Sequence, residues 1–389
     1  MNTAARVNTV MERIVVVGNG IAGQSACDSL RAAGFGGQLT VVGDEPIPAY
    51  SRPALSKALL TDGGSHELAA PAHGATERLG VAAIGLDVDA HLVRLDDGTD
   101  LPFDGLVIAT GARPRPLGAG ALVLRTLDDA LALRERLTGR PSVAVVGAGP
   151  LGMEVASAAA QAGCEVTVVA DTAPMRPQFG PYLSELFTAA ATAAGVKLVY
   201  GTATGLDAGT VSLDDGGRVS AELVVAAIGD MPNVEWLRGS GLLTDGRLIA
   251  DSRGRIAPGI VAAGDVAHAP IRGVVRRIPL WNSAIEQARA AAAALLLGDA
   301  APEFDADPYF WTEQFGLHLK AIGHLPVAGE PTVLLGDDPA GDPHGPVLLH
   351  WRHPDGAGVA VAINHRIPIP KLRRAAATGE VPTTARTAR

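Results

Sequence analysis

The 389-residue chain is poor in several features that would place it in particular protein classes. Its two cysteines, Cys27 and Cys164, are far apart and belong to no Cys-x-x-Cys pair, which excludes a disulfide framework and favours a reducing cytosol. Basic residues number 32 against 41 acidic ones, and this argues against nucleic acid as the main partner, because phosphate binding needs a basic surface. Aromatic residues make up only 4% of the chain, so alanine and glycine must fill much of its interior.

Long hydrophobic runs are also missing. No apolar run reaches the roughly 18 residues that a membrane-spanning helix needs. The first dozen residues lack the apolar core of a secretory signal, so we expect a cytoplasmic protein without a membrane anchor. A composition of 47% hydrophobic and 19% charged residues is typical of a globular protein, and the length predicts two or three domains. No metal site is predicted.

Two glycine-rich turns of the same kind stand 129 positions apart in the chain. The first lies in Ile14–Gly23 (IVVVGNGIAG) and the second in Val143–Gly152 (VAVVGAGPLG). Each follows a short apolar run and precedes an alanine-rich helical stretch, as in a strand–turn–helix unit that binds a dinucleotide. Such glycines let the backbone turn tightly and approach a pyrophosphate at a helix N-terminus. They are Gly18, Gly20 and Gly23 in the first turn, and Gly147, Gly149 and Gly152 in the second.

An acidic residue follows each turn at the distance expected for a ribose-binding carboxylate. Asp44 lies 21 residues after Gly23, and Asp171 lies 19 residues after Gly152. One such turn also occurs as a plain strand–helix connection, but two with both acids indicate two dinucleotides in one chain. This layout predicts a flavoprotein that takes hydride from a nicotinamide. Asp171 favours NADH over NADPH because it would repel a 2′-phosphate, although Arg176 lies nearby.

The two halves resemble each other beyond the glycines. Leu106–Ala109 and Leu223–Ile228 are both apolar strands that lead to a glycine, which indicates an internal duplication of domain size. Gly259–Asp265 is a third strand-then-turn segment, and a strongly helical stretch follows at Ser283–Leu297. Asp265 can bind the ribitol hydroxyls of a flavin, or can simply cap the turn that follows it.

Two cations lie in Tyr50–Lys57 (YSRPALSK), after the first predicted strand–helix–strand unit. Arg52 and Lys57 would then lie near the bound cofactor. A lysine near the flavin edge would stabilise the anionic reduced flavin. Since a buried lysine needs a partner, we expect Glu154 to pair with it. The alternative is an ordinary solvated lysine.

Several segments together resemble the family of FAD-dependent NADH:ferredoxin reductases, from about Arg13 to about Arg374. Besides the two turns and YSRPALSK, they are VIATGARPR (Val107–Arg115), IGDMPN (Ile228–Asn233), AAGDVA (Ala262–Ala267) and PYFWTEQFG (Pro308–Gly316). The resemblance implies an α/β fold of glutathione-reductase-like architecture, with two Rossmann-like dinucleotide-binding domains and a small α+β C-terminal domain. The implied parts are an FAD domain at 1–115 and 247–307, an NAD domain at 116–246, the C-terminal domain at 308–375, and a polar tail at 376–389 that we expect to be disordered.

The resemblance also implies roles for individual residues. Those expected to bind FAD are Gly18, Gly20, Gly23, Asp44, Arg52, Lys57, Thr110, Arg115 and Asp265. Those expected to bind NAD are Gly147, Gly149, Gly152 and Asp171. Lys57 and Glu154 would pair beside the flavin, and Trp311 would lie near the flavin where the nicotinamide enters; otherwise Trp311 would be ordinary packing.

Two departures from the family pattern concern nicotinamide binding. Relatives often end the second strand of the NAD domain with Glu, where this chain has Ala170 followed by Asp171. Relatives often carry an acid before the last helix of the FAD domain, where this chain has Pro279.

The function that the resemblance implies is transfer of electrons from NADH through FAD to a small acidic iron–sulfur ferredoxin. That ferredoxin would feed a haem monooxygenase or a ring-hydroxylating oxygenase. We expect a monomer or homodimer, and a basic docking patch drawn from a few cations near the end of the FAD domain and the chain. The candidates are Arg272, Arg276, Arg277, Lys371, Arg373 and Arg374.

The positions of the cysteines bear on the other functions that this architecture can have. Tyr50–Lys57 contains none, which argues against disulfide reductases, NADH peroxidases and coenzyme A disulfide reductases. A redox-switched NADH-binding flavoprotein resembling apoptosis-inducing factor and a rubredoxin reductase remain alternatives. A membrane-surface quinone reductase would need an amphipathic C-terminal anchor, and the basic segment Lys371–Arg374 is too short to make one.

Overall fold

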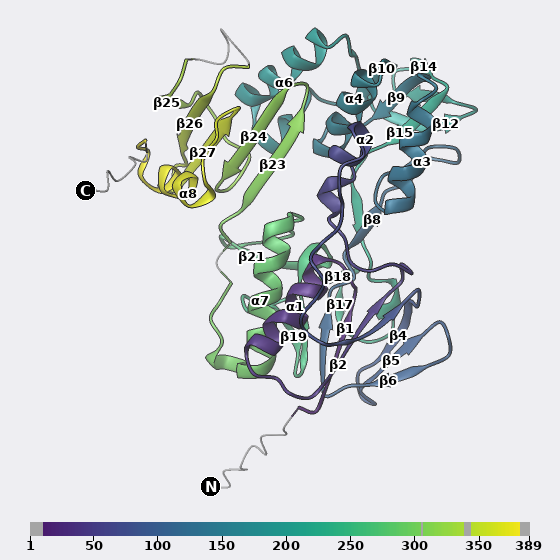
Figure 1. Cartoon of the computed structure of the whole chain (residues 1–389), viewed down its shortest axis with the longest axis vertical. Coiled ribbons are helices and arrows are strands. Elements are labelled where there is room, and N and C mark those ends of the chain that lie inside the picture. Colours follow the sequence, from purple (N-terminus) through teal and green to yellow (C-terminus); the bar gives the residue numbers. More distant parts are fainter. Residues whose placement is uncertain (1–10, 305, 338–343, 382–389) are drawn as a thin grey trace. The chain divides into compact units, whose positions relative to one another are not determined.

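The computed structural model describes residues 11–304, 306–337 and 344–381. The chain forms two compact units, and each unit is assembled from three separate segments (Figure 1). Unit one comprises Met1–Tyr50, Glu67–Ala112 and Pro232–Ala306. Unit two comprises Ser51–His66, Arg113–Met231 and Asp307–Arg389.

Unit one is built on a six-stranded sheet whose central strands are parallel. These strands are short apolar runs, and the four central ones are largely buried, which is typical of parallel sheets covered on both faces. In order across the sheet, the strands are β19 (Arg255–Ala257), β20 (Ile260–Ala262), β7 (Gly105–Ile108), β1 (Arg13–Val17), β2 (Gln38–Gly43) and β3 (Thr76–Leu79).

Different layers cover the two faces of this sheet. Helices α1 (Ile21–Ala32) and α7 (Trp281–Leu297) pack side by side on one face (Figure 1). Small buried alanine side chains line the contact between these helices and the sheet. The other face packs against β4 (Ala83–Asp87), β5 (Leu92–Leu95) and β6 (Asp100–Pro102). The remaining elements are β17 (Leu243–Thr244), β18 (Arg247–Ile249), β21 (Ala267–Ile271), β22 (Val274–Arg276), η2 (Glu235–Leu237), η3 (Gly264–Val266) and η4 (Gly298–Ala300).

Unit two contains a four-stranded parallel sheet and a three-stranded antiparallel one. The parallel strands are, in order, β11 (Lys197–Tyr200), β10 (Glu165–Ala170), β9 (Ser142–Val146) and β15 (Leu223–Ala226). The antiparallel strands are β12 (Ala203–Asp207), β13 (Thr210–Leu213) and β14 (Arg218–Ser220). The helices of this part are η1 (Arg52–Ala54), α2 (Ala58–Thr61), α3 (Leu127–Leu137), α4 (Pro150–Gln161), α5 (Arg176–Phe179) and α6 (Pro181–Ala193).

The two parallel sheets share one connection pattern. The order β3-β2-β1-β7 in unit one corresponds to β11-β10-β9-β15 in unit two. In each unit a three-stranded antiparallel sheet is inserted in the chain just before the fourth strand. The duplication and the two Rossmann-like halves that the sequence predicted are therefore confirmed.

The C-terminal part of unit two is a five-stranded antiparallel sheet with one helix packed on it. Its strands are, in order, β23 (Tyr309–Gln314), β24 (Leu317–Ile322), β27 (Gly358–Ile363), β26 (Val347–Arg352) and β25 (Thr332–Leu335), and its helix is α8 (Ile369–Thr378). The C-terminal part has the predicted α+β character.

Strands β8 (Ala112–Pro114) and β16 (Asp230–Pro232) form a separate two-stranded sheet where the chain passes between the units.

The two compact units divide the chain differently from the predicted domains, whose boundaries stay a prediction. Ser51–His66, expected within the first FAD segment, belongs to unit two, and the units change near residues 112 and 231 rather than 115 and 246. The C-terminal sheet joins the predicted NAD domain in one unit. Helix α8 continues to Thr378 with Ala376 buried, so residues 376–378 of the expected disordered tail are helical; residues 382–389 of that tail lie outside the described residues. Within the described ranges, no helix combines the length and apolar character needed to cross a bilayer.

Candidate dinucleotide sites and a buried ion pair

The first glycine turn joins β1 to α1, and two of its glycines are required by close contacts. Gly18 has φ +114°, and a Cβ there would lie 2.1 Å from the carbonyl oxygen of Ala109. A Cβ on Gly23 would lie 1.8 Å from the carbonyl oxygen of Gly18. A Cβ on Gly20 would meet nothing within 4 Å, so the middle glycine leaves the start of α1 open to close approach by a ligand.

The second turn, between β9 and α4, repeats this geometry. Gly147 has φ +110°, and its Cβ would lie 2.3 Å from the carbonyl oxygen of Ala227. A Cβ on Gly152 would lie 2.0 Å from the Gly147 oxygen. The middle glycine, Gly149, again has no backbone within 4 Å of its Cβ position, although one side-chain nitrogen lies 3.6 Å away, on Gln178. The residues present therefore fit two dinucleotides, one on each turn.

The two acids take equivalent places after the second strand of each unit. Gly18 donates its N–H to Val42 at 2.8 Å, and Gly147 donates its N–H to Val169 at 2.8 Å. Asp44 lies two residues after Val42, and Asp171 lies two residues after Val169, and both acids are exposed. Counted from these hydrogen bonds, Asp171 rather than Ala170 corresponds to Asp44.

Thr110 forms hydrogen bonds with another residue of the protein, Asn233. Its hydroxyl donates to the carbonyl oxygen of Asn233 at 2.8 Å, and the Asn233 side-chain amide donates to the Thr110 carbonyl at 2.9 Å. This reciprocal pair holds the residues after β7 against the end of the IGDMPN segment. Asn233 is the last residue of the motif IGDMPN, and the sequence did not predict it as a site residue.

Asp265 lies half-buried in η3, directly after β20. The preceding Gly264 has φ +79°, its N–H donates to the buried Gln287 side chain at 3.0 Å, and a Cβ there would lie 2.9 Å from the Cβ of Ala22 in α1. Arg277 donates to the Asp265 carbonyl oxygen at 2.9 Å. Asp265 is thus fixed beside the start of α1, in the same unit as the first glycine turn.

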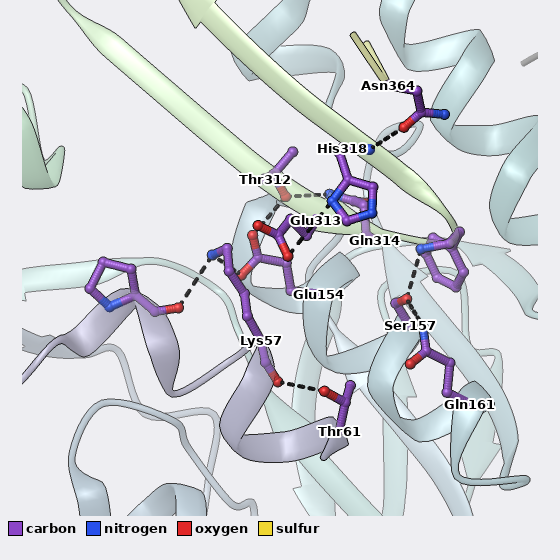
Figure 2. Close-up of polar contacts among 12 residues, drawn as sticks. Lys57, Thr61, Glu154, Ser157, Gln161, Thr312, Glu313, Gln314, His318 and Asn364 are labelled. Carbon is purple, nitrogen blue, oxygen red and sulfur yellow. Dashed lines mark hydrogen bonds and ion pairs between the residues drawn. The ribbon is translucent and has the colours of Figure 1, made fainter. Parts of the chain in front are cut away.

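Lys57 and Glu154 form the predicted ion pair, at 2.9 Å between Nζ and Oε2 (Figure 2). The Glu154 side chain is 4% exposed and that of Lys57 is 13% exposed, so the solvated-lysine alternative is wrong. Glu154 lies in the first turns of α4, two residues after Gly152. The lysine also donates to the carbonyl oxygen of Pro53 at 3.4 Å.

The Glu154 carboxylate has further partners that the sequence did not single out. Ser56 donates its hydroxyl to Oε2, and Thr312 donates its hydroxyl to Oε1 at 2.6 Å. Gln314 in turn donates to the Thr312 hydroxyl at 2.9 Å, as Figure 2 shows. Thr312 and Gln314 are buried on one face of β23, so a carboxylate taken out of water has both oxygens hydrogen-bonded.

Trp311 is half-buried on the neighbouring position of β23. Lys57 Nζ lies 5.7 Å from the centre of its indole ring, and Tyr309 stacks on the ring at 5.6 Å between centroids. Burial raises the pKa of the Tyr309 hydroxyl. The tryptophan is therefore a cation–π neighbour of the ion pair as well as part of the packing of the C-terminal sheet.

The two arginines predicted to bind FAD belong to unit two, unlike the first glycine turn. Arg52 donates to the carbonyl oxygen of Arg125 at 2.7 Å, which ties η1 to the segment before α3. Arg115 is exposed, and its backbone N–H donates to Gly229 at 2.9 Å. Pro279 is exposed just ahead of α7. Because it is a proline, this position supplies no carboxylate.

Both cysteines are free thiols, and neither belongs to the segment Tyr50–Lys57 that contains Lys57. Cys27 is fully buried within α1, and desolvation by burial raises its pKa to about 12. Cys164 lies just before β10, and burial raises its pKa as well. Neither thiol has the depressed pKa of a redox-active cysteine.

Comparisons with known proteins agree with this geometry. Residues 12–288 match the family described as pyridine nucleotide-disulphide oxidoreductase. The chain is 35% identical over 358 residues to the ferredoxin–NAD(+) reductase component of the p-cumate 2,3-dioxygenase system of Pseudomonas putida, covering 88% of this chain and 87% of that protein. It is 38% identical to rhodocoxin reductase of Rhodococcus erythropolis, covering 80% and 78%. The crystal structure of the covalent putidaredoxin reductase–putidaredoxin complex superimposes with a TM-score of 0.83 at 28% identity, covering 94% of this chain and 92% of that one.

Proposed function

This chain belongs to the pyridine nucleotide-disulphide oxidoreductase family, and from that premise we propose that it is an NADH-dependent, FAD-containing ferredoxin reductase. Its electron acceptor would be a small iron–sulfur ferredoxin that serves a haem monooxygenase or a ring-hydroxylating oxygenase. Relatives named as reductase components of a dioxygenase system and as rhodocoxin reductase support this choice, as does the relative solved in complex with putidaredoxin.

The observation that carries the proposal is the pair of congruent glycine turns in one chain. Each has a first glycine at strongly positive φ, a third glycine against the carbonyl of the first, and a middle glycine with no backbone close to it. Each is followed by a helix whose N-terminal N–H groups favour a diphosphate. Two nucleotide sites on two units suit an enzyme that moves electrons between two dinucleotides.

In unit one, we assign Gly18, Gly20 and Gly23 to the FAD diphosphate and Asp44 to the adenosine ribose. Asp265, fixed beside the start of α1, would bind ribitol hydroxyls. Thr110 acts through Asn233 and positions the end of β7. That Arg52 and Arg115 also contact FAD stays a prediction.

In unit two, Gly147, Gly149, Gly152 and Asp171 would bind NADH, with Asp171 accepting from the ribose hydroxyls and repelling the 2′-phosphate of NADPH. FAD would supply the redox chemistry, taking two electrons as hydride and releasing them singly to an iron–sulfur acceptor. Lys57 would place its charge where reduction makes the flavin negative, and Glu154 with its buried partners holds that ammonium in position. Trp311, beside Lys57, would border the path of the nicotinamide.

The cysteines set this chain apart from family members that reduce disulfides. Such chemistry needs a thiolate beside the flavin, and the segment Tyr50–Lys57 has none. Cys27, with a pKa of about 12, stays a thiol at physiological pH. A cytosolic location, which the unpaired cysteines favour, stays a prediction.

The docking surface for an acidic ferredoxin would include the β21–β22 hairpin. Val274 and Val275 are 60% and 44% exposed there, between Arg272 and Arg276, in a segment without acidic residues. Apolar contact ringed by cations suits an acidic partner despite the net charge of −9. Arg277, which holds the Asp265 backbone, should be left intact in tests of docking, and Arg373 already pairs with Asp307 at 2.7 Å.

Anaerobic rapid mixing tests the proposal. The purified protein should be yellow, NADH should bleach the flavin much faster than NADPH does, and an iron–sulfur ferredoxin should restore the colour. Arg272→Glu should slow only the last step, and chiefly at low salt. A protein that cannot be reconstituted with FAD, or whose flavin NADH does not bleach, would end the proposal.

The same experiment separates the two alternatives. Slow reoxidation by every ferredoxin, together with dimerisation on adding NADH, would favour a redox switch like apoptosis-inducing factor. Faster reoxidation by a rubredoxin than by any ferredoxin would make the protein a rubredoxin reductase.

A further inference from the structure

The two glycine turns differ in what lies over the middle glycine. Apart from its chain neighbours, no atom of the residues that the structure describes lies within 4 Å of the Cβ position of Gly20 in unit one. At the corresponding position of Gly149 in unit two, the nearest atom is Nε2 of Gln178, at 3.6 Å. A side-chain amide therefore lies over the part of the second turn where a diphosphate approaches the backbone.

The backbone of Gln178 is fastened to the turn itself. Met175, fully buried at φ +61°, donates its N–H to the carbonyl oxygen of Ala148 at 2.8 Å, and Ala148 lies between the first and middle glycines. The short helix α5 follows from Met175, whose carbonyl accepts from Gln178 at 3.1 Å and from Phe179 at 2.9 Å. A left-handed non-glycine residue costs energy, so this placement is imposed by the surrounding structure.

The amide of Gln178 has hydrogen-bonding capacity that the protein does not use. Its Oε1 is buried and has no hydrogen-bond partner among the residues that the structure describes. Buried polar atoms are normally paired, so an unpaired one at a proposed ligand site indicates a group supplied from outside the chain. A carboxamide can donate to a phosphate oxygen and accept from a ribose hydroxyl, and a dinucleotide offers both.

We infer that Gln178 is a further binding residue for the nicotinamide dinucleotide, with its side-chain amide contacting the diphosphate and the adjoining ribose at the second turn. The inference rests on the proposed function, because it assigns the second turn to NADH. A neutral amide suits this place, since a carboxylate there would repel the diphosphate.

The test is equilibrium binding of NAD⁺ to the oxidised, FAD-loaded protein by titration calorimetry, which needs no turnover. Gln178→Leu should raise the dissociation constant about tenfold, the usual effect of losing a hydrogen bond to a charged group. Gln178→Glu should raise it further, by about a hundredfold, through added charge repulsion.

Gln161→Leu is the matched control, because Gln161 lies at the far end of α4 and should leave binding unchanged. Flavin content and unfolding midpoint show whether each variant is folded, and Gln178→Asn provides a milder variant expected to lie between wild type and Gln178→Leu. If the wild type binds NAD⁺ and the folded leucine and glutamate variants bind it within twofold, the inference is overturned while the proposed function stands. If the wild type binds neither NAD⁺ nor NADH, both are overturned.

Discussion

The turn before α1 and the turn before α4 have the same backbone path, yet the helices that follow carry different chemistry. Ser25 of α1 and Glu154 of α4 stand at corresponding positions, seven residues after the first glycine of each turn. Ser25 is half-buried, whereas Glu154 is a buried carboxylate joined to Lys57, Ser56 and Thr312.

The comparison shows that backbone and side chains have different roles at the two turns. The glycines create a dinucleotide site in either unit, and the first turns of the helix decide whether charged groups accompany it. In α1, Gln24 hydrogen-bonds through its Nε2 to Asn19 at 2.5 Å and through its Oε1 to the His73 ring at 2.9 Å. Within the described ranges of the chain, a buried charge pair beside a glycine turn occurs in unit two alone, as Lys57 and Glu154.

Alanine at the third glycine of each turn should give the largest effects and should separate the two sites. Gly23→Ala forces a Cβ to 1.8 Å from a carbonyl oxygen, and we expect a protein purified without flavin. Gly152→Ala makes the same clash in unit two, and we expect a yellow protein that NADH bleaches at least about a hundredfold more slowly, a barrier increase of roughly 2.7 kcal/mol.

The readouts are the flavin-to-protein absorbance ratio and the anaerobic bleaching rate. Gly36→Ala and Gly205→Ala are controls, because a Cβ at either site meets nothing within 4 Å and neither has positive φ. Loss of flavin in both test variants would show that the turns are not independent.

Removing the Glu154 carboxylate beside the second turn should destabilise the protein. The change at the corresponding residue of the first turn, Ser25, should not. Glu154→Ala leaves the Lys57 ammonium buried without its partner and should lower the free energy of unfolding by about 3–5 kcal/mol. Thr312→Val, which removes one donor to the carboxylate, should cost about 1–3 kcal/mol.

Denaturant unfolding followed by flavin fluorescence measures both changes. Ser25→Ala is the control and should stay within about 0.5 kcal/mol of wild type. If Glu154→Ala were no less stable than Ser25→Ala, the ion pair would contribute nothing to the unit that contains it.

The acids after the second strands should differ in what they select. Asp171→Asn removes the charge that repels a 2′-phosphate, and we expect the preference for NADH over NADPH in kcat/KM to fall about tenfold. Asp44→Asn should leave that preference unchanged and weaken FAD retention instead. An unchanged preference in Asp171→Asn would mean that Asp171 does not contact the adenosine ribose.

The smallest expected effect is a difference in the labelling rates of the two thiols, one in each unit. With its pKa at about 12, Cys27 has about one thiolate in ten thousand at pH 8, against about one in four for an ordinary thiol. Raising the pH ionises the thiol, so its labelling should speed up about tenfold per pH unit below pH 12. Mass spectrometry after thiol labelling at pH 8 should show Cys164 modified first, and equal labelling would show that α1 opens readily.

The parts of the molecule that depend on local pattern were predictable from the sequence. The glycine turns, the duplicated strands and the Lys57–Glu154 contact follow from residue types at short range or from one strong charge requirement. Thr312 and Gln314 stand two positions apart on β23, so both side chains lie on the same buried face of the strand. This spacing of two polar residues was the available sequence signal for the network around Glu154.

Other features depend on distant segments and left no local signal. Nothing near Gln178 in the sequence indicates that its amide lies over Gly149, because that placement follows from the Met175–Ala148 hydrogen bond. The place of Ser51–His66 in unit two likewise left no local signal in the sequence. Helix α2 within this segment contacts α3 and α4, which come much later in the chain.

The interleaving of segments has a consequence for biosynthesis. Unit one cannot close its sheet until β20 has been synthesised to lie beside β7, and unit two cannot surround Glu154 until Thr312 has left the ribosome. Neither unit is a contiguous piece that could fold early and wait. A nascent chain stalled before residue 312 would therefore hold Lys57 and Glu154 without the Thr312 hydroxyl that donates to the carboxylate in the complete protein.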